Sequence, residues 1–184
     1  MGRPRKFSRN GILEKAYPVF WKNGFARTTL PELEQATGVN KSGLYSEFES
    51  KEELFVACLE HYFDTRSIRD ILSSTPLGLG NIQRFLEEAP GSMPGQAGCL
   101  FVNAMPDLSA LPSEARHVIA RSKMMLEKLL IPNIEAEIPA ANTAAICRLI
   151  SIFFSGICIE TNLDLNRTAD RVAVRDFIQM LRST

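Results

Sequence analysis

The sequence lacks the signatures of most metal centres and catalytic sites. Its 184 residues include two histidines and four cysteines, with no Cys-x-x-Cys pair. His61 and His117 lie far apart in the sequence, so we expect no structural zinc site. Cys99 and His117 are the one conceivable pair of nucleophile and base, but no phosphate-binding loop, oxyanion motif, metal signature or third orienting group accompanies them. The sequence therefore predicts neither an enzyme nor a bound metal or cofactor.

Long hydrophobic runs and targeting signals are also missing. The N-terminus shows no charged region followed by the apolar stretch of a signal peptide. The longest apolar run, Ala144 to Ile159, has 16 residues and is short for a bilayer span. These absences predict a cytoplasmic protein. In such a protein we expect the free cysteines to be buried and reduced, namely Cys58, Cys99, Cys147 and Cys158.

Alternating β-branched residues, internal repeats and low-complexity tracts are absent, whereas apolar residues recur at helical spacing almost throughout. The pattern predicts an all-α protein with about nine helices. They are expected near residues 9–23, 30–37, 41–48, 51–63, 81–88, 99–105, 112–131, 139–162 and 168–181. Helical capping signals mark several ends, because Thr29 with Glu32 and Ser50 with Glu53 have the spacing of capping boxes and Gly38 can close a helix.

Charge is unevenly distributed along the chain. The chain holds 21 basic and 21 acidic residues, but residues 1–46 contain eight basic residues against three acidic ones. The eight are Arg3, Arg5, Lys6, Arg9, Lys15, Lys22, Arg27 and Lys41. A basic end joined to an acidic remainder predicts an anionic partner for the first part only.

Two short predicted helices flank Gly38-Val39-Asn40, with apolar residues facing each other across this turn, as in a helix-turn-helix. Residues 9–55 resemble the DNA-binding domain of the TetR family of bacterial transcriptional regulators. The most specific part is TGVNKSGLYSEFESKEELF, from Thr37 to Phe55. The resemblance implies an N-terminal three-helix DNA-binding domain and a C-terminal helical ligand-binding and dimerisation domain.

The resemblance also implies roles for individual residues. The start of the recognition helix would read base edges through Asn40, Lys41, Ser42 and Gly43, and its groove-facing part extends to Ser46. Phosphate contacts are implied for Thr29, Tyr45 and Lys51, whose side chains offer hydroxyl or ammonium donors. The basic arm before the first helix could follow a minor groove through Arg3, Arg5 and Lys6, or serve only as a solubilising tail.

Three residues depart from the family pattern. Glu34 stands where a small residue is usual, which predicts looser packing of the helix pair. Glu47 stands where a histidine is frequent, and a carboxylate cannot donate to a phosphate. Pro18 lies inside the first predicted helix, where it removes a hydrogen-bond donor and predicts a kink.

The sequence thus predicts a DNA-binding domain over residues 1–48 and an effector-binding and dimerisation domain over residues 49–184. The run from Ala144 to Ile159 is apolar at 12 of 16 positions, so this helix should be buried on two sides, one of them in a second copy. The expected interface of the homodimer comprises Ile150, Phe153, Ile157, Phe177 and Leu181. The expected effector pocket comprises Phe63, Cys99, Phe101, Met105, Met125 and Phe154.

The favoured function is a repressor that a small-molecule effector releases from an inverted-repeat double-stranded DNA operator. Activation instead of repression stays open. One alternative is a repressor of the same fold that senses oxidants or electrophiles through Cys99, within the family-like segment Gly98 to Asn103. The other is a helical interaction module without DNA binding, which the basic N-terminal part argues against.

Overall fold

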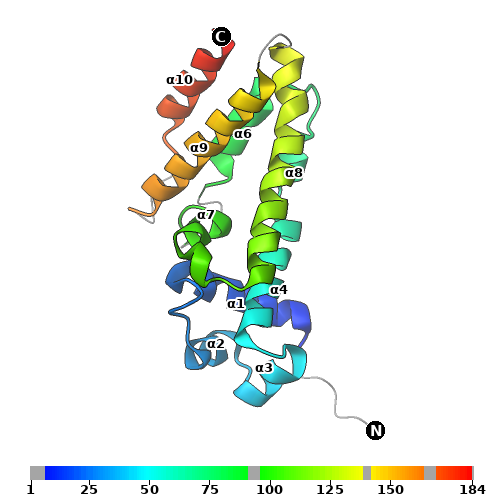
Figure 1. The fold of residues 1–184 in the computed structure, drawn as a ribbon, viewed down its shortest axis with the longest axis vertical. Coiled ribbons are helices and arrows are strands. Elements are labelled where there is room, and N and C mark those ends of the chain that lie inside the picture. The colour runs from blue at the N-terminus through cyan, green and yellow to red at the C-terminus, as the bar shows by residue number, and fades with distance from the viewer. Residues whose placement is uncertain (1–6, 91–95, 139–141, 164–168, 184) are drawn as a thin grey trace. The chain divides into compact units, whose positions relative to one another are not determined.

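The computed structural model describes residues 7–90, 96–138, 142–163 and 169–183, and every regular element in these ranges is a helix (Figure 1). The all-α prediction is therefore confirmed. In chain order the elements are α1 (Arg9–Asn23), α2 (Leu30–Thr37), α3 (Lys41–Glu47), α4 (Lys51–Thr65), α5 (Ile68–Leu72), α6 (Leu79–Glu88), α7 (Leu100–Ala104), the 3-10 helix η1 (Met105–Ala110), α8 (Ser113–Glu137), α9 (Thr143–Thr161) and α10 (Arg171–Arg182).

The chain forms two compact units, which are described separately. One unit comprises residues up to Thr65 together with Ala104–Ala120, and the other comprises Arg66–Asn103 and Arg121–Thr184. The first unit therefore contains α4 in addition to the predicted helix-turn-helix. The functional division at residue 48 remains a prediction, because compactness does not say where a DNA-binding role ends.

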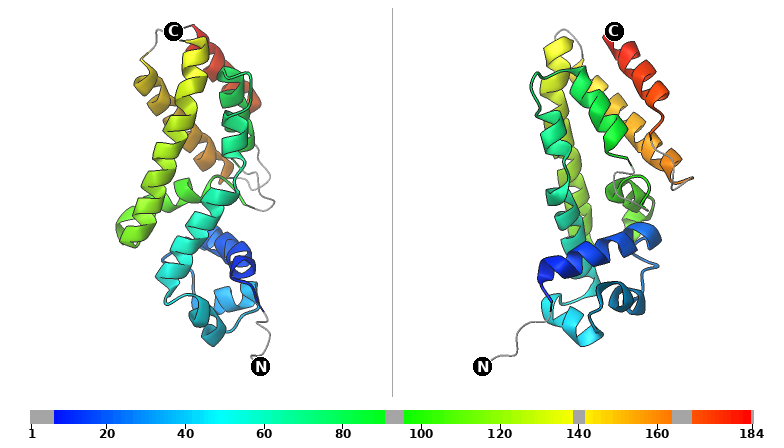
Figure 2. Two further views of the ribbon diagram at one scale, coloured as in Figure 1. Left: turned by 90° about the vertical axis from the view of Figure 1, so that its right-hand side faces the viewer. Right: turned by 180° about the vertical axis from the view of Figure 1, so that it is seen from behind.

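The first unit is built around α1, which packs against α2 and α4 (Figure 2). The side chain of Ser8 accepts a hydrogen bond from the Gly11 N–H at 3.1 Å and so caps the start of α1. The helix continues through Pro18 to Asn23. Its apolar residues Ile12, Leu13, Ala16 and Phe20 are all buried, as their spacing predicts.

Aromatic side chains fill the core of the first unit. The ring of Phe55 from α4 lies 5.0 Å from that of Phe20 and 5.0 Å from that of Phe25. Trp21 meets Tyr62 edge-on at 5.1 Å. Such ring pairs add to the burial of large apolar surfaces, so α1, the turn that follows it and α4 are held as one body.

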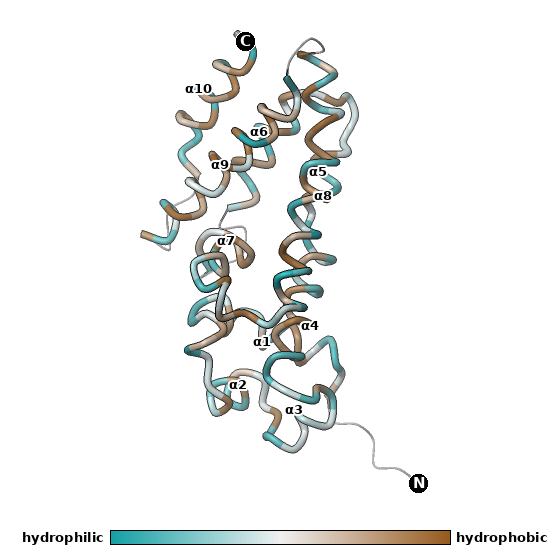
Figure 3. Tube along the Cα trace, viewed as in Figure 1, coloured by the Kyte–Doolittle hydropathy of each residue, from teal (hydrophilic) through white to brown (hydrophobic). Residues whose placement is uncertain are grey.

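The second unit packs α6 against α5 and α10. Phe85 of α6 stacks on Phe154 of α9 at 4.8 Å, and Phe153 stacks on Phe177 of α10 at 4.1 Å. Hydrophobic residues recur every three or four positions along α10, among hydrophilic ones, as expected of a helix with one buried face (Figure 3).

A buried asparagine joins distant parts of the second unit. The side chain of Asn133 donates to the carbonyl oxygens of Leu72 and Leu129 at 2.7 and 2.9 Å, and it accepts from the Gly78 N–H at 3.0 Å. It lies just after Pro132, where the sequence predicts that the helix has ended, yet α8 continues to Glu137. We attribute the longer helix to these partners, which fix the turn that contains the proline.

Candidate nucleic-acid interface

The helix-turn-helix of the sequence prediction is formed by α2, α3 and the turn between them. Gly38 closes α2 in the left-handed conformation, with φ 71°, which only glycine adopts readily. Val39 and Leu44 are buried, as is Leu33 on α2. The Thr37 hydroxyl donates to the Leu33 carbonyl at 2.6 Å and accepts from the Val39 N–H at 3.2 Å. The turn is therefore held by both packing and hydrogen bonds.

Thr29, a predicted phosphate contact, is engaged within the chain at the start of α2. Its backbone N–H donates to Oε2 of Glu32 at 2.8 Å, as in the predicted capping box, and its hydroxyl donates to the same oxygen at 2.7 Å. These bonds, with a further one from Asn23 at 3.0 Å, hold the pKa of the Glu32 carboxyl below its usual value, the Thr29 backbone N–H contributing most. The Thr29 hydroxyl hydrogen is therefore directed at Glu32, and its phosphate contact remains a prediction.

The first turn of α3 carries the residues predicted to read bases. Asn40 caps the helix, because its side-chain oxygen accepts from the Gly43 N–H at 2.9 Å. The carboxylate of Glu34 accepts from the Lys41 N–H. Glu34 thus fastens α2 to α3, and the looser packing predicted for this position is not what the structure shows. The N-terminus of the recognition helix is fixed by one amide and one carboxylate.

Side chains on the outer face of α3 remain available to a partner. Asn40, Lys41, Ser42, Tyr45 and Ser46 are exposed. The Lys41 ammonium lies 5.9 Å from the centre of the Tyr45 ring, and the Ser46 hydroxyl donates to the Gly43 carbonyl at 2.7 Å. These predicted contact residues of α3 thus lie on one exposed surface, while their contact with bases or, for Tyr45, with phosphate remains a prediction.

Gly43 has a packing role that the sequence did not reveal. A Cβ built on Gly43 would lie 2.6 Å from Cγ1 of Val39 and 3.2 Å from the side-chain oxygen of Asn40. The buried Val39 cannot move away without disturbing the turn. Gly43 therefore lets the recognition helix lie close to the turn before it.

Lys51, a predicted phosphate contact, is engaged within the chain. Its ammonium donates to the carbonyl oxygens of Phe25 and Thr28 at 3.1 and 3.0 Å, and it lies 4.6 Å from the centre of the Phe25 ring. An ammonium has three donors, so two are occupied within the chain. Lys51 therefore links the start of α4 to the segment before α2. The sequence missed this role because the partners are backbone carbonyls more than 20 residues away.

Arg9 and Glu53 extend the site beyond the predicted residues. Arg9 contacts the end of α3 and also Glu53 of α4, whose backbone N–H donates to the Ser50 hydroxyl at 3.1 Å. The Ser50 cap was predicted, but the Glu53 carboxylate accepts from the Glu49 N–H instead of the Ser50 N–H. The sequence shows Arg9 only as one of the basic residues of the N-terminal part, with no sign of these partners.

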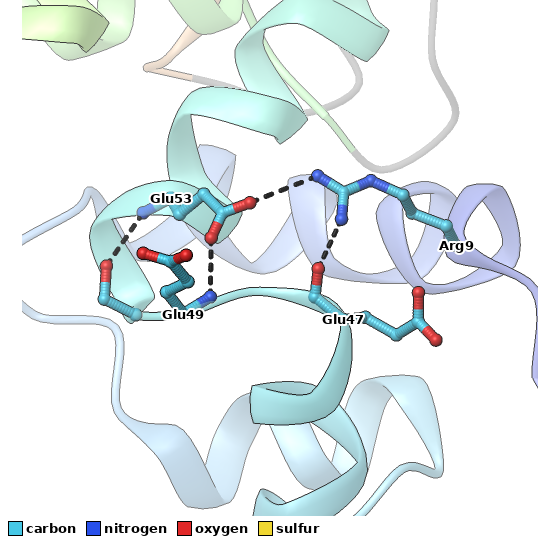
Figure 4. Close-up of polar contacts among 5 residues, drawn as sticks. Arg9, Glu47, Glu49 and Glu53 are labelled. Atoms are coloured by element: carbon cyan, nitrogen blue, oxygen red, sulfur yellow. Dashed lines mark hydrogen bonds and ion pairs between the residues drawn. The ribbon is translucent and has the colours of Figure 1, made fainter.

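The arm residues Arg3, Arg5 and Lys6 lie outside the described residues, so their minor-groove contact remains a prediction. Glu47 is half-buried, and its carboxylate lies away from the Arg9 guanidinium, which contacts the Glu47 backbone carbonyl instead (Figure 4). The doubt about a phosphate contact at Glu47 is therefore unchanged.

The predicted effector residues are divided between the two units. Phe63 is buried in α4 and Met105 is exposed in η1, both in the first unit. Phe154 and Cys99 are buried in the second unit, where Phe101 and Met125 are partly buried. Phe154 stacks on Phe85, which identifies it as a core residue of that unit. The effector pocket itself remains a prediction.

The four cysteines are all buried free thiols, as predicted. Burial raises the pKa of the Cys58 thiol far above its usual range, and burial together with the neighbouring Cys99 does the same for Cys158. Burial also raises the pKa of Cys147. A thiol that stays protonated is a poor nucleophile, so these three cysteines are packing residues at neutral pH. Among the described residues no cluster of His, Cys, Asp or Glu could hold a metal ion.

Three residues of the predicted dimer interface are buried within a single chain, and the interface remains a prediction. Ile150, Phe177 and Leu181 are 0, 9 and 2% exposed within a single chain, so they belong to its own core. Phe153 and Ile157 are partly buried. The exposed apolar residues of this region are instead Leu149, Ile152, Ile159, Leu163, Val172 and Met180. A helix apolar on all sides gives no sequence signal for which side faces inward, so the sequence could not separate residues of the chain's own core from those left exposed.

Comparisons with known proteins agree with this geometry. Residues 12–58 match the model of the family described as bacterial regulatory proteins, tetR family. The HTH-type transcriptional repressor ComR of Escherichia coli (strain K12) is 30% identical over 135 residues, or 70% of this chain and 64% of ComR. The repressor BdcR of the same organism is 29% identical over 120 residues, or 64% of this chain and 60% of BdcR. The matched region spans less than two thirds of either relative.

A solved structure shows a similar fold over nearly the whole chain. The TetR family transcriptional regulator CifR, as a cysteine mutant complexed with 26-bp double-strand operator DNA, superposes with a TM-score of 0.77 at 22% identity. The match covers 99% of both chains. At this identity the likeness establishes a shared fold, and the second unit is included in it.

Proposed function

Because this chain belongs to the TetR family of bacterial regulatory proteins, we propose that it is a cytoplasmic, sequence-specific DNA-binding repressor of transcription. As a member of a family of DNA-binding regulators, it is not an enzyme. The observation that carries the proposal is the exposed face of α3, held at its start by Asn40 and Glu34. A rigid helix with exposed amide, ammonium and hydroxyl groups suits direct reading of base edges in a major groove.

The charge of residues 1–46 supports the same partner. The excess of basic over acidic residues lies within residues 1–46, and the acidic excess lies in the remainder. Phosphates would be held by the exposed cations of the N-terminal part and by free N–H groups at helix starts, while α3 reads sequence. Binding that depends on such cations weakens steeply as salt is raised.

A second copy of the chain is the proposed partner of the exposed apolar face of α9 and α10. Leu149, Ile152 and Ile159 lie on one side of α9, and Gly156 among them is exposed, with nothing within 4 Å of a Cβ built on it. Val172 and Met180 are exposed on α10. A second copy would cover these residues, and a two-fold dimer would place two copies of α3 against an inverted-repeat operator.

The alternative cover for α9 is a lipid bilayer. By length and composition alone α9 could cross a membrane, and 28% of it is buried within the chain. Exposed Arg148 and Glu160 lie on this helix near its apolar face. Placing charges in hydrocarbon is costly, so a protein partner fits the face better.

Control by a small-molecule effector completes the proposal. The effector would bind in the second unit. It would favour one distance between the DNA-binding domains of the two copies over another. Such control requires only that the effector bind the two arrangements with different affinity. The cysteine-sensing alternative has weaker support, because Cys99 is buried and burial raises the pKa of the neighbouring Cys158 thiol.

Selection of bound duplexes from a random DNA pool tests the proposed function. We expect the full-length protein to enrich one inverted repeat, with two half-sites separated by about one helical turn or a multiple of it. The enriched duplex then serves to screen small molecules that release it. If repeated rounds enrich no sequence, or enrich only a single unrepeated half-site, the proposal of a dimeric repressor is wrong.

A further inference from the structure

Arg9 connects three helices of the first unit at the end of the recognition helix. Its Nη1 donates to the Glu47 backbone carbonyl, and its Nη2 lies 3.4 Å from Oε1 of Glu53. The guanidinium carbon lies 4.1 Å from the centre of the Phe48 ring. Figure 4 shows the guanidinium between the Glu47 carbonyl and the Glu53 carboxylate. One side chain of α1 thus contacts both the end of α3 and the start of α4.

The Arg9 contacts add to the packing of Leu44 and Phe48, each 1% exposed, at the end of α3. The helix has seven residues, and a helix this short is not stable without tertiary contacts. Its last carbonyls lack intrahelical donors. The chain leaves α3 at Phe48 in an extended conformation, with φ −139° and ψ 126°, so no glycine motif closes the helix. The Arg9 guanidinium donates to a carbonyl at this end of the helix, and its positive charge complements the negative end of the helix dipole.

Glu53 fixes Arg9 in turn. One carboxylate oxygen faces the guanidinium, and the other accepts from the Glu49 N–H in the segment between α3 and α4. Glu53 itself lies in the first turn of α4. The position of the guanidinium therefore depends on the position of the start of α4.

We infer that Arg9 is a positioning residue for sequence reading, which acts by fixing the end of α3 in an orientation set by Glu53. The inference rests on the proposed function. Both side chains are nearly half exposed, so this ion pair adds little to stability. Its effect is geometric, because a planar guanidinium can hold a carbonyl, a carboxylate and a ring face at once, whereas an ammonium cannot keep that arrangement.

Base contacts and phosphate contacts depend differently on orientation. Base edges are read over short distances with fixed directions, whereas attraction to phosphates tolerates a small rotation of the helix. Loss of the Arg9 contacts should therefore reduce the preference for the operator more than the affinity for unrelated DNA. A direct phosphate contact by Arg9 would affect both affinities alike.

Glu53→Gln separates positioning from simple electrostatics. Removing a negative charge near DNA should tighten binding if charge alone matters, whereas release of Arg9 should weaken operator binding. Glu52→Gln is the matched control, because Glu52 is the exposed neighbour in the same turn and does not contact Arg9. Arg9→Lys keeps the positive charge but replaces the planar guanidinium by an ammonium, so it tests the contact geometry at constant charge.

The experiment measures the affinity of the full-length wild type and of these three variants for the selected operator and for an unrelated duplex of equal length. We expect Glu53→Gln and Arg9→Lys to lower the ratio of the two affinities about tenfold, the scale of one lost base contact. Glu52→Gln should keep the ratio of the wild type. A ratio in Glu53→Gln that equals or exceeds that of Glu52→Gln overturns the inference.

Hydrogen exchange of the free protein provides a second readout that does not involve DNA. Amides of α3 should exchange faster in Arg9→Lys and Glu53→Gln than in Glu52→Gln, while amides of α1 stay protected. Unchanged exchange in α3 also overturns the inference. If the wild type shows no preference for any duplex, the proposed function fails, and exchange in α3 alone then decides whether Arg9 fixes this helix.

Discussion

The ammonium of Lys51 lies 3.0 Å from the carbonyl oxygen of Thr28, so the first residue of α4 holds the residue that precedes the cap of α2. The same ammonium donates to Phe25. This relationship changes what substitution of Lys51 should do. A residue expected to bind phosphate also holds the segment before α2, and its phosphate contact remains a prediction.

Lys51→Ala should therefore destabilise the protein as well as weaken its binding to DNA. Two hydrogen bonds from a charged donor are lost, and we expect the free energy of unfolding to fall by about 2 kcal/mol. Urea unfolding of wild type and variant measures this difference. Lys15→Ala, on the exposed side of α1, is the control and should leave stability unchanged. If Lys51→Ala unfolds at the wild-type urea concentration, the bracing role is wrong.

Gly43→Ala should destabilise the first unit even though alanine favours helices. Its new Cβ would meet Val39 at 2.6 Å, and relief of such an overlap typically costs about 1–3 kcal/mol of the free energy of unfolding. Gly80→Ala on α6 is the matched control, because a Cβ there meets nothing within 4 Å. We expect it to raise the free energy of unfolding by about 0.5–1 kcal/mol. Equal changes in the free energy of unfolding of the two variants would show that Val39 can move aside for the new Cβ without cost.

Ile152→Glu should convert a dimer into monomers. Ile152 is 68% exposed in the single chain, so the substitution leaves the chain's own core intact but places charge on the face proposed to meet a second copy. Met124→Glu, at a residue of α8 that is 59% exposed, is the control and should remain dimeric. Analytical ultracentrifugation measures both variants. A monomeric wild type that binds lipid vesicles would mean that α9 has a membrane partner instead.

Alkaline pH should destabilise the protein through its buried thiols. Burial raises the pKa of Cys58 in the folded state, so this thiol stays protonated at a pH where the unfolded chain already ionises, above about 8.5. The stabilising contribution of the Cys58 thiol to the free energy of unfolding is fully present below that pH. It is lost as pH rises further, by at most about 1.4 kcal/mol per pH unit. Urea unfolding between pH 7 and 10, in reductant, should show a shallower loss for Cys58→Ala than for wild type. Parallel profiles would show that Cys58 ionises normally.

The parts of the fold that the sequence predicted well are those with local signals. Thr29 with Glu32 and Gly38 mark the ends of α2, and Asn40 marks the start of α3, because each acts on backbone groups a few residues away. The five-residue α5 was missed, since a helix of that length has no periodic pattern. The extension of α8 past Ile131 depends on Asn133, whose partners Leu72 and Gly78 are distant in sequence.

The candidate site divides in the same way. Exposed polar residues of α3 follow from its motif and its register. The remaining contacts join residues that are distant in sequence. Glu34 and Lys41 are 7 positions apart, Lys51 and Phe25 are 26 apart, and Arg9 and Glu47 are 38 apart. Long charged side chains can reach many partners, and the sequence does not say which partner the fold brings near.

The most direct test of the account is the affinity of the full-length protein for its selected inverted repeat, compared with a duplex of the same composition in scrambled order, at about 0.15 M salt. We predict that the protein prefers the repeat by about a thousandfold or more, and that both affinities fall steeply as salt is raised. Equal affinity for the two duplexes, or binding to neither, would contradict the assignment of α3 as the sequence-reading helix.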